Sequence, residues 1–299
     1  MSDLSAISSD EEKKEYPGRF PKWLKRPVAF SGKQNSVEHH LKSAGLHTVC
    51  SEAKCPNRSE CYNKGTATFL IMGNVCTRNC SFCSVNHGSP LPPDPSEGMR
   101  VAEAAAKMGL KHVVITSVTR DDLVDGGASC FAQVVQAINC KLPGAVVEIL
   151  IPDFKGNKDS LTTVLQSSPG ILNHNIETVP RLYASIRPEA DYNRSLDLLK
   201  AASQINPDVR TKSGIMVGLG ETEAEVRGVL EDLFETGCTI ITIGQYLRPS
   251  KRQFPVREFV SPDQFAVYEQ IGREIGFKQV FAGPYVRSSY RAEEICKGF

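Results

Sequence analysis

Six of the ten cysteines in this 299-residue chain form two closely spaced triads. Their spacings are C-x4-C-x5-C and C-x3-C-x2-C, and their members are Cys50, Cys55, Cys61 and Cys76, Cys80, Cys83. Thiolates are the usual ligands of iron–sulfur clusters, and a four-iron cluster normally takes four of them. Three thiolates leave one iron free for a substrate, a cofactor or a weaker ligand. Two such sites in one chain indicate redox chemistry rather than a structural staple.

A disulfide framework and a zinc site account for the cysteines less well. Disulfide scaffolds are usually short, secreted and dense in cysteine, whereas this chain is long and residues 1–27 contain no apolar signal core. Zinc would suit Cys80 and Cys83 with His87 or Cys76, but each triad has an odd count and no obvious fourth partner. The remaining cysteines have no motif spacing and are predicted to be small hydrophobic packing residues: Cys130, Cys140, Cys238 and Cys296.

The composition predicts one large globular core. The chain is 40% hydrophobic and 23% charged, with a formal net charge of +1, which argues against a strong electrostatic mode of nucleic-acid binding. The basic segment 19–26 is expected to be a solvated arm with its aromatic side chains tucked onto the body. The sequence contains no 18-residue apolar stretch, heptad repeat or presequence, so we expect a cytoplasmic monomer that does not span a membrane.

Seven short apolar runs typical of buried strands recur along the chain, at 66–73, 111–118, 145–153, 170–178, 210–219, 238–247 and 278–286. Stretches with helical periodicity separate most of them, at 98–109, 127–139, 158–167, 192–204, 221–236 and 262–275. This alternation predicts a parallel sheet with right-handed crossovers, in six β/α units plus a further strand. It favours a partial barrel over a closed one of eight units.

Reactive groups of such folds lie on the loops after the carboxyl ends of the strands. Cys76 follows the first strand run by three residues, so the second triad is predicted to lie over the barrel mouth. The first triad lies upstream of the first strand. We therefore predict an N-terminal extension over 1–65 that carries this triad, a barrel over 66–276 and a C-terminal extension over 277–299.

A C-x3-C-x2-C motif on the loop after the first strand resembles the radical S-adenosylmethionine (SAM) superfamily. Further segments make the chain similar to the lipoyl synthase family from about residue 20 to 296. These are the upstream C-x4-C-x5-C, PKWLKRP, TSVTRDDLVDGGA, LNHNIET and VRSSYRAEE. The resemblance implies an α/β fold, namely a partial (β/α)6 barrel of the radical SAM type with N- and C-terminal extensions.

The resemblance also implies two 4Fe-4S clusters and SAM as cofactors. The reducing cluster would be held by Cys76, Cys80 and Cys83, with SAM on its open iron. The auxiliary cluster would be held by Cys50, Cys55, Cys61 and a serine of RSSY, either Ser288 or Ser289, of which we favour Ser289. Because a serine oxygen is a poorer partner for such iron than a thiolate, we hypothesise that the serine-bound iron leaves first. Without the resemblance, RSSY would be interpreted as a capping or turn segment.

The activity that the resemblance implies is lipoyl synthesis. Two sulfur atoms from the auxiliary cluster would be inserted at C6 and C8 of an octanoyl chain, by means of 5′-deoxyadenosyl radicals from SAM. The chain would be attached to a lysine of the lipoyl domain of a 2-oxo-acid dehydrogenase E2 or of the glycine-cleavage H protein. Implied partners are a ferredoxin or flavodoxin-type reductant and a cluster-repair protein.

Several further residues are candidates for binding SAM. Gly214 and Gly218 lie in a run similar to the superfamily's GxIxGxxE and are expected to let the backbone approach the adenosine, although a plain strand-to-helix turn with Glu221 in the first helical turn also fits. Asn173, Asn175 and Glu177 alternate along the fourth strand run and, if they face the interior, would bind the ribose. Arg210 and Lys212 alternate likewise and are candidates for the methionine carboxylate.

Four different functions compete with lipoyl synthesis. A methylthiotransferase typically adds a C-terminal RNA-binding barrel, and no run of short strands follows residue 286. An enzyme similar to biotin synthase would carry its auxiliary cysteines within the barrel rather than upstream. A non-catalytic electron carrier or zinc-binding protein needs no barrel of two hundred residues, and a zinc protein would be colourless where a cluster protein is brown.

Overall fold

The computed structural model describes residues 19–25, 32–290 and Ala292. The segment 1–18 of the predicted N-terminal extension, Arg26 of the predicted arm and Cys296, predicted to be a packing residue, lie outside the described residues. The strands are β1 (His47–Thr48), β2 (Thr68–Ile71), β3 (Val75–Cys76), β4 (Asn86–His87), β5 (His112–Ser117), β6 (Val146–Leu150), β7 (Ile171–Asn173), β8 (Arg210–Val217), β9 (Ile240–Gln245) and β10 (Gln279–Gly283).

The helices alternate with the strands of the main sheet. They are α1 (Gly32–Ser43), α2 (Val49–Glu52), α3 (Arg58–Asn63), α4 (Glu97–Lys107), α5 (Ala128–Lys141), α6 (Lys158–Gln166), α7 (Tyr183–Ile186), α8 (Tyr192–Ile205), α9 (Glu223–Glu235) and α10 (Pro262–Ile275), with 3-10 turns η1 (Lys22–Leu24), η2 (Phe154–Gly156) and η3 (Pro180–Leu182).

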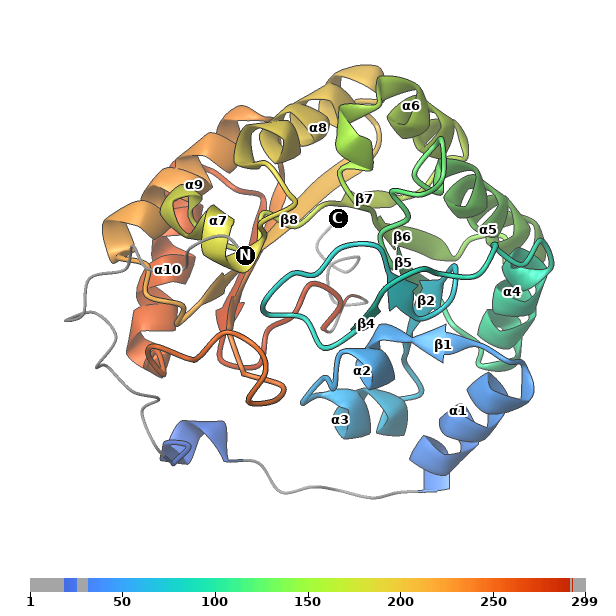
Figure 1. Cartoon of the computed structure of the whole chain (residues 1–299), viewed down its shortest axis with the longest axis horizontal. Coiled ribbons are helices and arrows are strands. Elements are labelled where there is room, and N and C mark those ends of the chain that lie inside the picture. Colours follow the sequence, from blue (N-terminus) through green and yellow to red (C-terminus); the bar gives the residue numbers. More distant parts are fainter. Residues whose placement is uncertain (1–18, 26–31, 291, 293–299) are drawn as a thin grey trace.

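The main sheet is an open, curved sheet with the strand order β1-β2-β5-β6-β7-β8-β9-β10. Its strands from β2 to β10 are parallel, and β1 is added antiparallel to β2. Helices α4, α5, α6, α8, α9 and α10 form an outer arc around it, and α1, α2 and α3 lie on the open side (Figure 1). The predicted six β/α units plus a further strand, and the partial rather than closed barrel, are confirmed.

The strands are buried on both faces, which explains their nearly continuous apolar sequences. Phe69, Val113, Ile115 and Ile149 have no exposed surface and belong to the main hydrophobic core. The residues between these core-facing positions point into the barrel, because successive side chains of a strand alternate between its faces. The interior-facing positions nearest the carboxyl ends of the strands line a cavity, and include Leu70, Thr116, Leu150, Met216 and Thr242.

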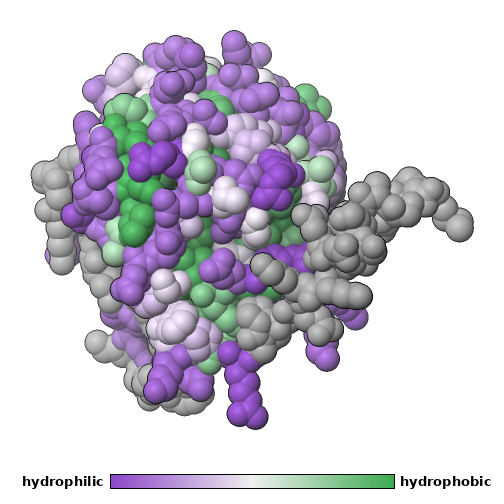
Figure 2. Space-filling view, turned by 90° about the vertical axis from the view of Figure 1, so that its left-hand side faces the viewer, coloured by the Kyte–Doolittle hydropathy of each residue, from purple (hydrophilic) through white to green (hydrophobic). Residues whose placement is uncertain are grey.

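Local signals fix the ends of the helices. Thr222 and Glu225 form a capping box at the start of α9, and Ser261 caps α10 ahead of Pro262. Gly276 ends α10 with a φ of 114°, a conformation that a side chain would strain. The outer helices are amphipathic, and the face in Figure 2 is accordingly mostly hydrophilic, with hydrophobic residues confined to narrow strips.

One expectation about the elements was wrong, and one alternative does not fit the structure. The fourth strand run was expected to extend to 178, but β7 ends at Asn173, and residues 174–178 form a bend in which Glu177 has a φ of 68°. Glu221 was a candidate for the first turn of a helix, yet Thr222 is the N-cap of α9. The Glu221 carboxylate instead accepts hydrogen bonds from the backbone N–H groups of Gly218 at 2.5 Å and Leu219 at 2.9 Å.

The two ends of the described chain pack against each other. The Tyr285 hydroxyl donates to the carbonyl of Leu24 at 2.8 Å, and Asn57 Nδ2 donates to the carbonyl of Tyr285 at 2.7 Å. Phe20 packs edge-on against Phe259 with ring centroids 5.5 Å apart, but Phe20 is 45% and Trp23 42% exposed, so the expectation that these aromatic side chains tuck onto the body holds only in part. In the part of the chain that the structure describes, no helix is long and apolar enough to cross a bilayer.

Candidate active site: two cysteine triads at one cavity

A cavity of about 360 Å³ opens at the carboxyl ends of the parallel strands. Its lining includes members of both triads and both serines of the RSSY segment: Cys50, Cys55, Cys76, Cys80, Cys83, Ser288 and Ser289. Cys61 does not line the cavity, but its thiol lies close enough to Cys50 and Cys55 for their charges to raise its pKa. Residues from positions 50 to 289 therefore meet around one space.

The second triad lies on a loop that hydrogen bonds hold against the rest of the barrel. Cys76 ends β3, and its sulfur accepts hydrogen bonds from the N–H groups of Arg78 at 3.4 Å and Thr119 at 3.3 Å. Cys83 accepts one from Val85 at 3.5 Å. Such N–H groups stabilise negative charge on cluster ligands. Burial raises the pKa of Cys80 to about 11 and that of Cys83 to about 12.

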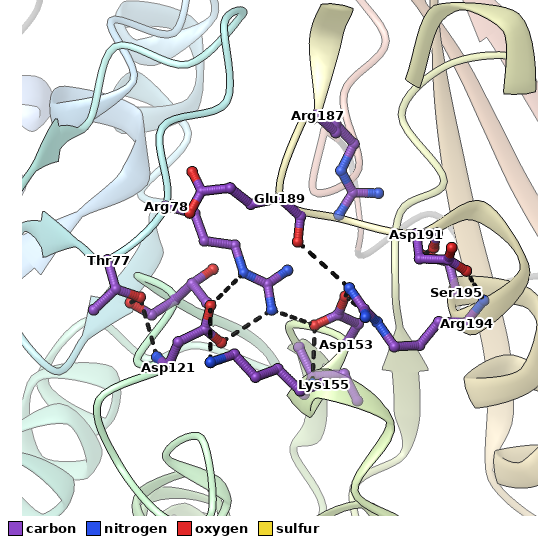
Figure 3. A network of polar contacts seen from close by, with 12 residues as sticks. Thr77, Arg78, Asp121, Asp153, Lys155, Arg187, Glu189, Asp191, Arg194 and Ser195 are labelled. Atoms are coloured by element: carbon purple, nitrogen blue, oxygen red, sulfur yellow. Dashed lines mark hydrogen bonds and ion pairs between the residues drawn. The ribbon is translucent and has the colours of Figure 1, made fainter. Parts of the chain in front are cut away.

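Arg78 fastens this loop to the interior of the fold (Figure 3). Its guanidinium donates to Asp121 at 2.6 and 3.0 Å and to Asp153 at 2.6 Å. Arg194 on α8 pairs with the other carboxylate oxygen of Asp153 at 2.8 Å. Although burial opposes it, Arg78 lowers the pKa of Asp153, so the network is ionised at neutral pH. Arg78, on the loop of the second triad, therefore bonds both the loop after β5 and the loop after β6.

The first triad is formed by two short helices. Cys50 lies in α2, Cys61 in α3, and Cys55 in the turn between them. The Thr48 hydroxyl caps α2 and hydrogen-bonds the Tyr62 hydroxyl at 2.7 Å, which joins the two helices. Burial raises the pKa of Cys50 to about 11 and that of Cys61 to about 12.

The segment 285–289 enters the barrel and brings a serine to the first triad. Thr68 Oγ1 donates to Ser289 Oγ at 2.8 Å, and the backbone N–H of Thr68 hydrogen-bonds the Cys50 sulfur, which favours the thiolate. Ser288 instead exchanges hydrogen bonds with the Asn175 amide at 2.7 and 3.0 Å. Gly244 makes room for the segment, because a Cβ there would collide with the carbonyl oxygen of Val286. Ser289 is therefore the serine that adjoins Cys50.

The bend after β7 supplies polar groups to the cavity wall. Asn175 Nδ2 donates to Glu177 at 3.0 Å, and both side chains line the cavity. His174 Nδ1 lies 2.9 Å from the carbonyl oxygen of Ile151, while its Nε2 has no hydrogen-bond partner in the described structure. Burial and the neighbouring guanidiniums of Arg187 and Arg78 lower the pKa of His174 to about 4, so it is neutral and presents an acceptor to the cavity.

Arg187 is a cavity residue that no motif in the sequence indicates. It follows α7, has 9% of its surface exposed, and donates to the carbonyl of Asn175 at 3.0 Å. Its Nε has no hydrogen-bond partner in the described structure, and its charge lies close enough to Cys80 to favour that thiolate. A buried guanidinium with a spare donor beside the second triad is suited to bind a carboxylate.

Four predicted SAM-binding residues do not line this cavity: Asn173, Arg210, Lys212 and Gly218. Lys212 is fully buried below it, with Nζ 2.7 Å from Glu148 Oε1. His112 Nε2 lies 3.0 Å from the other Glu148 oxygen, and Asn173 Nδ2 is 3.5 Å from the first. Arg210 starts β8 at the opposite end of the strand. These positions do not support a role for Arg210 or Lys212 in holding the methionine carboxylate.

The two candidate glycines differ in what surrounds them. Gly214 lines the cavity, and a Cβ there would meet Thr242 Oγ1 at 2.7 Å and Asn175 Oδ1 at 2.9 Å. Gly218 has a φ of 94°, and a Cβ there would collide with the side-chain amide of Gln245. Gly214 therefore lets the side chains of Thr242 and Asn175 approach its backbone closely inside the cavity. Gly218 is instead needed for the turn after β8.

The residues present fit two clusters and one SAM molecule. All six triad cysteines are free thiols and sit in two groups, each close enough for its members to influence one another's pKa. Among the described residues, no three His, Cys, Asp or Glu side chains are grouped as they would be around a single metal ion. A four-iron cluster is larger than an ion, so its thiolates lie farther apart. The unpartnered Nε2 of His174 and Nε of Arg187 provide buried polar contacts for a ligand.

Comparison with known proteins identifies relatives over most of the chain. Residues 70–233 match the radical SAM superfamily. A lipoyl synthase of Caldanaerobacter subterraneus subsp. tengcongensis is 56% identical over 275 residues, which cover 92% of this chain and 96% of that protein. A lipoyl synthase of Rubrobacter xylanophilus is 52% identical over 92% of this chain and 85% of that protein.

Solved structures share the fold at much lower sequence identity. Streptococcus suis SuiB bound to S-adenosylmethionine superposes with a TM-score of 0.56 at 13% identity, over 76% of this chain and 54% of that one. The [FeFe]-hydrogenase maturase HydG gives a TM-score of 0.55 at 19% identity, over 73% of this chain and 56% of that one. These similarities concern the fold alone.

Proposed function

The chain belongs to the lipoyl synthase family within the radical SAM superfamily, and we propose that a shared cavity brings SAM and two clusters to a single octanoyl chain. The enzyme is a sulfurtransferase that inserts two sulfur atoms, at C6 and C8, into an octanoyl chain on a lysine of a carrier protein. The observation that carries the proposal is that members of both triads line the same cavity. A radical formed at one triad then needs no long transfer to reach a sulfur held at the other.

We propose that each triad holds three irons of one 4Fe-4S cluster. Cys76, Cys80 and Cys83 would hold the reducing cluster, because their loop lies over the strand ends and Arg78 fixes it there. Their N–H···S contacts favour the charged ligand state. When bound, SAM and the two clusters supply the reducing electron, the 5′-deoxyadenosyl radical and the two sulfur atoms.

Arg187 replaces Arg210 and Lys212 as the proposed partner of the methionine carboxylate of SAM. It lies beside Cys80, is buried, and retains a donor without a partner in the described structure. Asn175 and Glu177 are the proposed ribose ligands, since both line the cavity and are already oriented by their mutual hydrogen bond. Asn173 leaves this set because it faces Glu148.

The auxiliary cluster would be held by Cys50, Cys55, Cys61 and Ser289. Ser289 adjoins Cys50 through Thr68, whereas Ser288 is engaged by Asn175 on the SAM side. A serine ligand suits a cluster that must come apart, because the hard oxygen binds such iron less well than sulfur does.

Between the triads, the cavity wall is largely apolar. Leu70, Leu150, Ile151, Ile215 and Tyr246 all line it. Such a wall gives an alkyl chain a favourable site and keeps water away from reactive species. The protein's own contribution to the reaction is therefore to hold the octanoyl carbons between the two clusters.

The partners follow from the reaction. The substrate is an octanoylated carrier protein, and we propose the lipoyl domain of a 2-oxo-acid dehydrogenase E2 or the glycine-cleavage H protein. A ferredoxin or flavodoxin would supply electrons, and a cluster-repair protein would restore the consumed auxiliary cluster. A cytoplasmic location and a monomeric state stay predictions.

The activity is tested with anaerobically purified, cluster-loaded protein, dithionite, SAM and a peptide that contains octanoyl-lysine. Mass spectrometry is expected to show a gain of two sulfurs, with loss of two hydrogens once the ring closes, together with 5′-deoxyadenosine and methionine. Deoxyadenosine without sulfur gain, from protein with a loaded auxiliary cluster, would contradict this substrate. If neither product forms although both clusters are intact, the result would contradict the enzyme assignment.

The two serines form a matched pair of variants. Ser289→Ala is expected to lower the iron content of the auxiliary cluster and reduce sulfur insertion by about tenfold or more while deoxyadenosine formation continues, as for loss of a metal-site contact. Ser288→Ala should spare the auxiliary cluster and weaken SAM binding instead, because Ser288 contacts Asn175. Iron analysis and Mössbauer spectra check the first point without recourse to activity.

If Ser288→Ala lowered the iron content of the auxiliary cluster and Ser289→Ala did not, Ser288 would be the ligand. Ser289→Cys tests the release hypothesis separately, since a thiolate should retain its iron longer than a serine oxygen does. Sulfur insertion by Ser289→Cys at the normal rate would show that the serine is not needed for disassembly.

A further inference from the structure

The turn between β9 and α10 presents two cations at the surface. Lys251 and Arg252 are exposed, while the side chains around them are used within the turn. Arg248 donates to the carbonyls of Gln253 at 2.7 Å and Lys251 at 2.6 Å, and the Ser250 hydroxyl donates to the Gln253 side chain at 2.6 Å. These hydrogen bonds fix the backbone of the turn, so the exposed Lys251 and Arg252 extend from a rigid segment.

This turn lies at the rim of the cavity. Leu247 and Pro249 line the cavity itself. Gln253 Nε2 donates to the carbonyl of Cys83 at 3.1 Å, and the N–H of Phe254 donates to the carbonyl of Ser81 at 2.8 Å. The turn is therefore fixed to the loop that carries the second triad.

The segment of the first triad carries two more exposed cations, one at this cavity and one in the adjoining pocket that both of them line. Lys54 lies between Cys50 and Cys55, is exposed and lines the cavity, and the exposed Arg58 begins α3. The Ser84 hydroxyl donates to the carbonyl of Glu52 at 2.8 Å, so the loop of the second triad is bonded both to this segment and to the turn described above. In Figure 1 the loop coloured for residues near 250 lies on the same open side as α2 and α3.

We call Lys54, Arg58, Lys251 and Arg252 the cationic rim. No ion pair with a carboxylate is present for any of the four in the described parts of the chain. The chain's formal net charge is only +1, so the rim is a local excess. By contrast, the exposed carboxylates of Asp122 and Glu189 are engaged by Arg120 and by the N–H of Asn79.

We propose that the cationic rim docks an acidic face of the octanoylated carrier protein, around its modified lysine. The inference rests on the proposed function, since the octanoyl carbons must enter the cavity while the carrier remains outside on its rim. Opposite charges across such a contact speed encounter and fix orientation. Octanoylation also removes the positive charge of the carrier lysine, so the modified side chain no longer repels the rim.

The test compares two substrates and two charge-reversal variants in holoenzyme reduced with dithionite. Lys251→Glu with Arg252→Glu is expected to raise KM for the octanoylated carrier protein about tenfold, with kcat unchanged, because like charges then face each other. KM for a short neutral octanoyl-lysine peptide should not change. Raising the ionic strength should weaken wild-type binding of the carrier and close the gap, since exposed charges are screened by salt.

The control is Lys107→Glu with Lys111→Glu, which reverses two exposed charges at the opposite end of the sheet, beside the start of β5. It should leave both KM values unchanged. Lys251→Ala with Arg252→Ala serves as a second test variant and should give a smaller change in the same direction. Uncoupled deoxyadenosine formation from SAM confirms that each variant is loaded and folded.

Three results would overturn the proposal. One is an unchanged KM for the carrier in both rim variants. Another is an equal rise in KM for carrier and peptide, which would indicate damage to the cavity. A defect that occurs with a protein reductant but not with dithionite would assign the rim to the electron donor. In all three cases, sulfur insertion into the peptide by the wild-type enzyme would leave the proposed function standing.

Discussion

Cys83→Ala and Cys50→Ala are expected to separate the two halves of the reaction. Cys83→Ala should reduce both deoxyadenosine formation and sulfur insertion to background. Cys50→Ala should abolish sulfur insertion only, and deoxyadenosine should still form from SAM. The physical reason is that the two triads lie on different segments, α2–α3 and the loop after β3, although they meet at one cavity.

Iron and sulfide analysis checks this expectation alongside product analysis. Each variant should hold about half of the wild-type iron, because a cluster that loses one of few thiolate ligands is strongly weakened. Cys140→Ala is the control, since Cys140 is exposed on α5 away from the cavity, and it should behave as the wild type. Loss of deoxyadenosine in Cys50→Ala would contradict a division of labour between the triads.

The second large effect is expected in the buried ion pair below the cavity. Lys212→Met should lower the free energy of unfolding by about 3–5 kcal/mol, the usual cost of leaving a buried charge without its partner. Glu148 and Lys212 are both fully buried, 2.7 Å apart. Burial raises the pKa of Glu148, and Lys212 together with His112 lowers it more, so the variant loses the main group that keeps this buried carboxylate ionised.

Urea unfolding of the two single variants and the double variant measures the coupling. Glu148→Leu combined with Lys212→Met should recover most of the lost stability, because replacing a buried pair with apolar residues is often neutral. His112, which faces Glu148 at 3.0 Å, is kept unchanged in all three. A double variant no more stable than Lys212→Met would show that the cost came from packing rather than from charge.

The fold was largely predictable because buried parallel strands give short apolar runs that differ from the periodicity of helices. All seven runs contain a strand, from Thr68–Ile71 to Gln279–Gly283. Strand ends were less predictable. Residues 174–178 have a strand-like composition, yet the backbone bends there. The N–H of Ile176 donates to the Ser213 hydroxyl instead of to a backbone carbonyl of the neighbouring strand.

Within the site, cysteine spacing was informative because the triads are local in sequence. The SAM contacts were harder to predict. Alternation correctly indicated that Lys212 faces inward, but it says nothing about depth, which depends on the register across the sheet. On β8 the cavity lining begins at Gly214, two residues after Lys212, and the Lys212 side chain instead reaches Glu148 at 2.7 Å. Arg187 lies in no motif, and only the fold brings it beside Cys80.

The way in which the C-terminal segment closes the barrel has a consequence for how the enzyme is made. Ser289 meets Thr68 across 221 positions, Asn57 meets Tyr285 across 228, and Tyr285 meets Leu24 across 261. Chains are synthesised from the amino end, and contacts between distant positions must wait for the later partner. The cysteines of the first triad therefore leave the ribosome long before Ser289, so the auxiliary site that we propose is complete only after residue 289 has been made. A messenger truncated before that codon is expected to yield the proposed reducing site without the proposed serine ligand of the other.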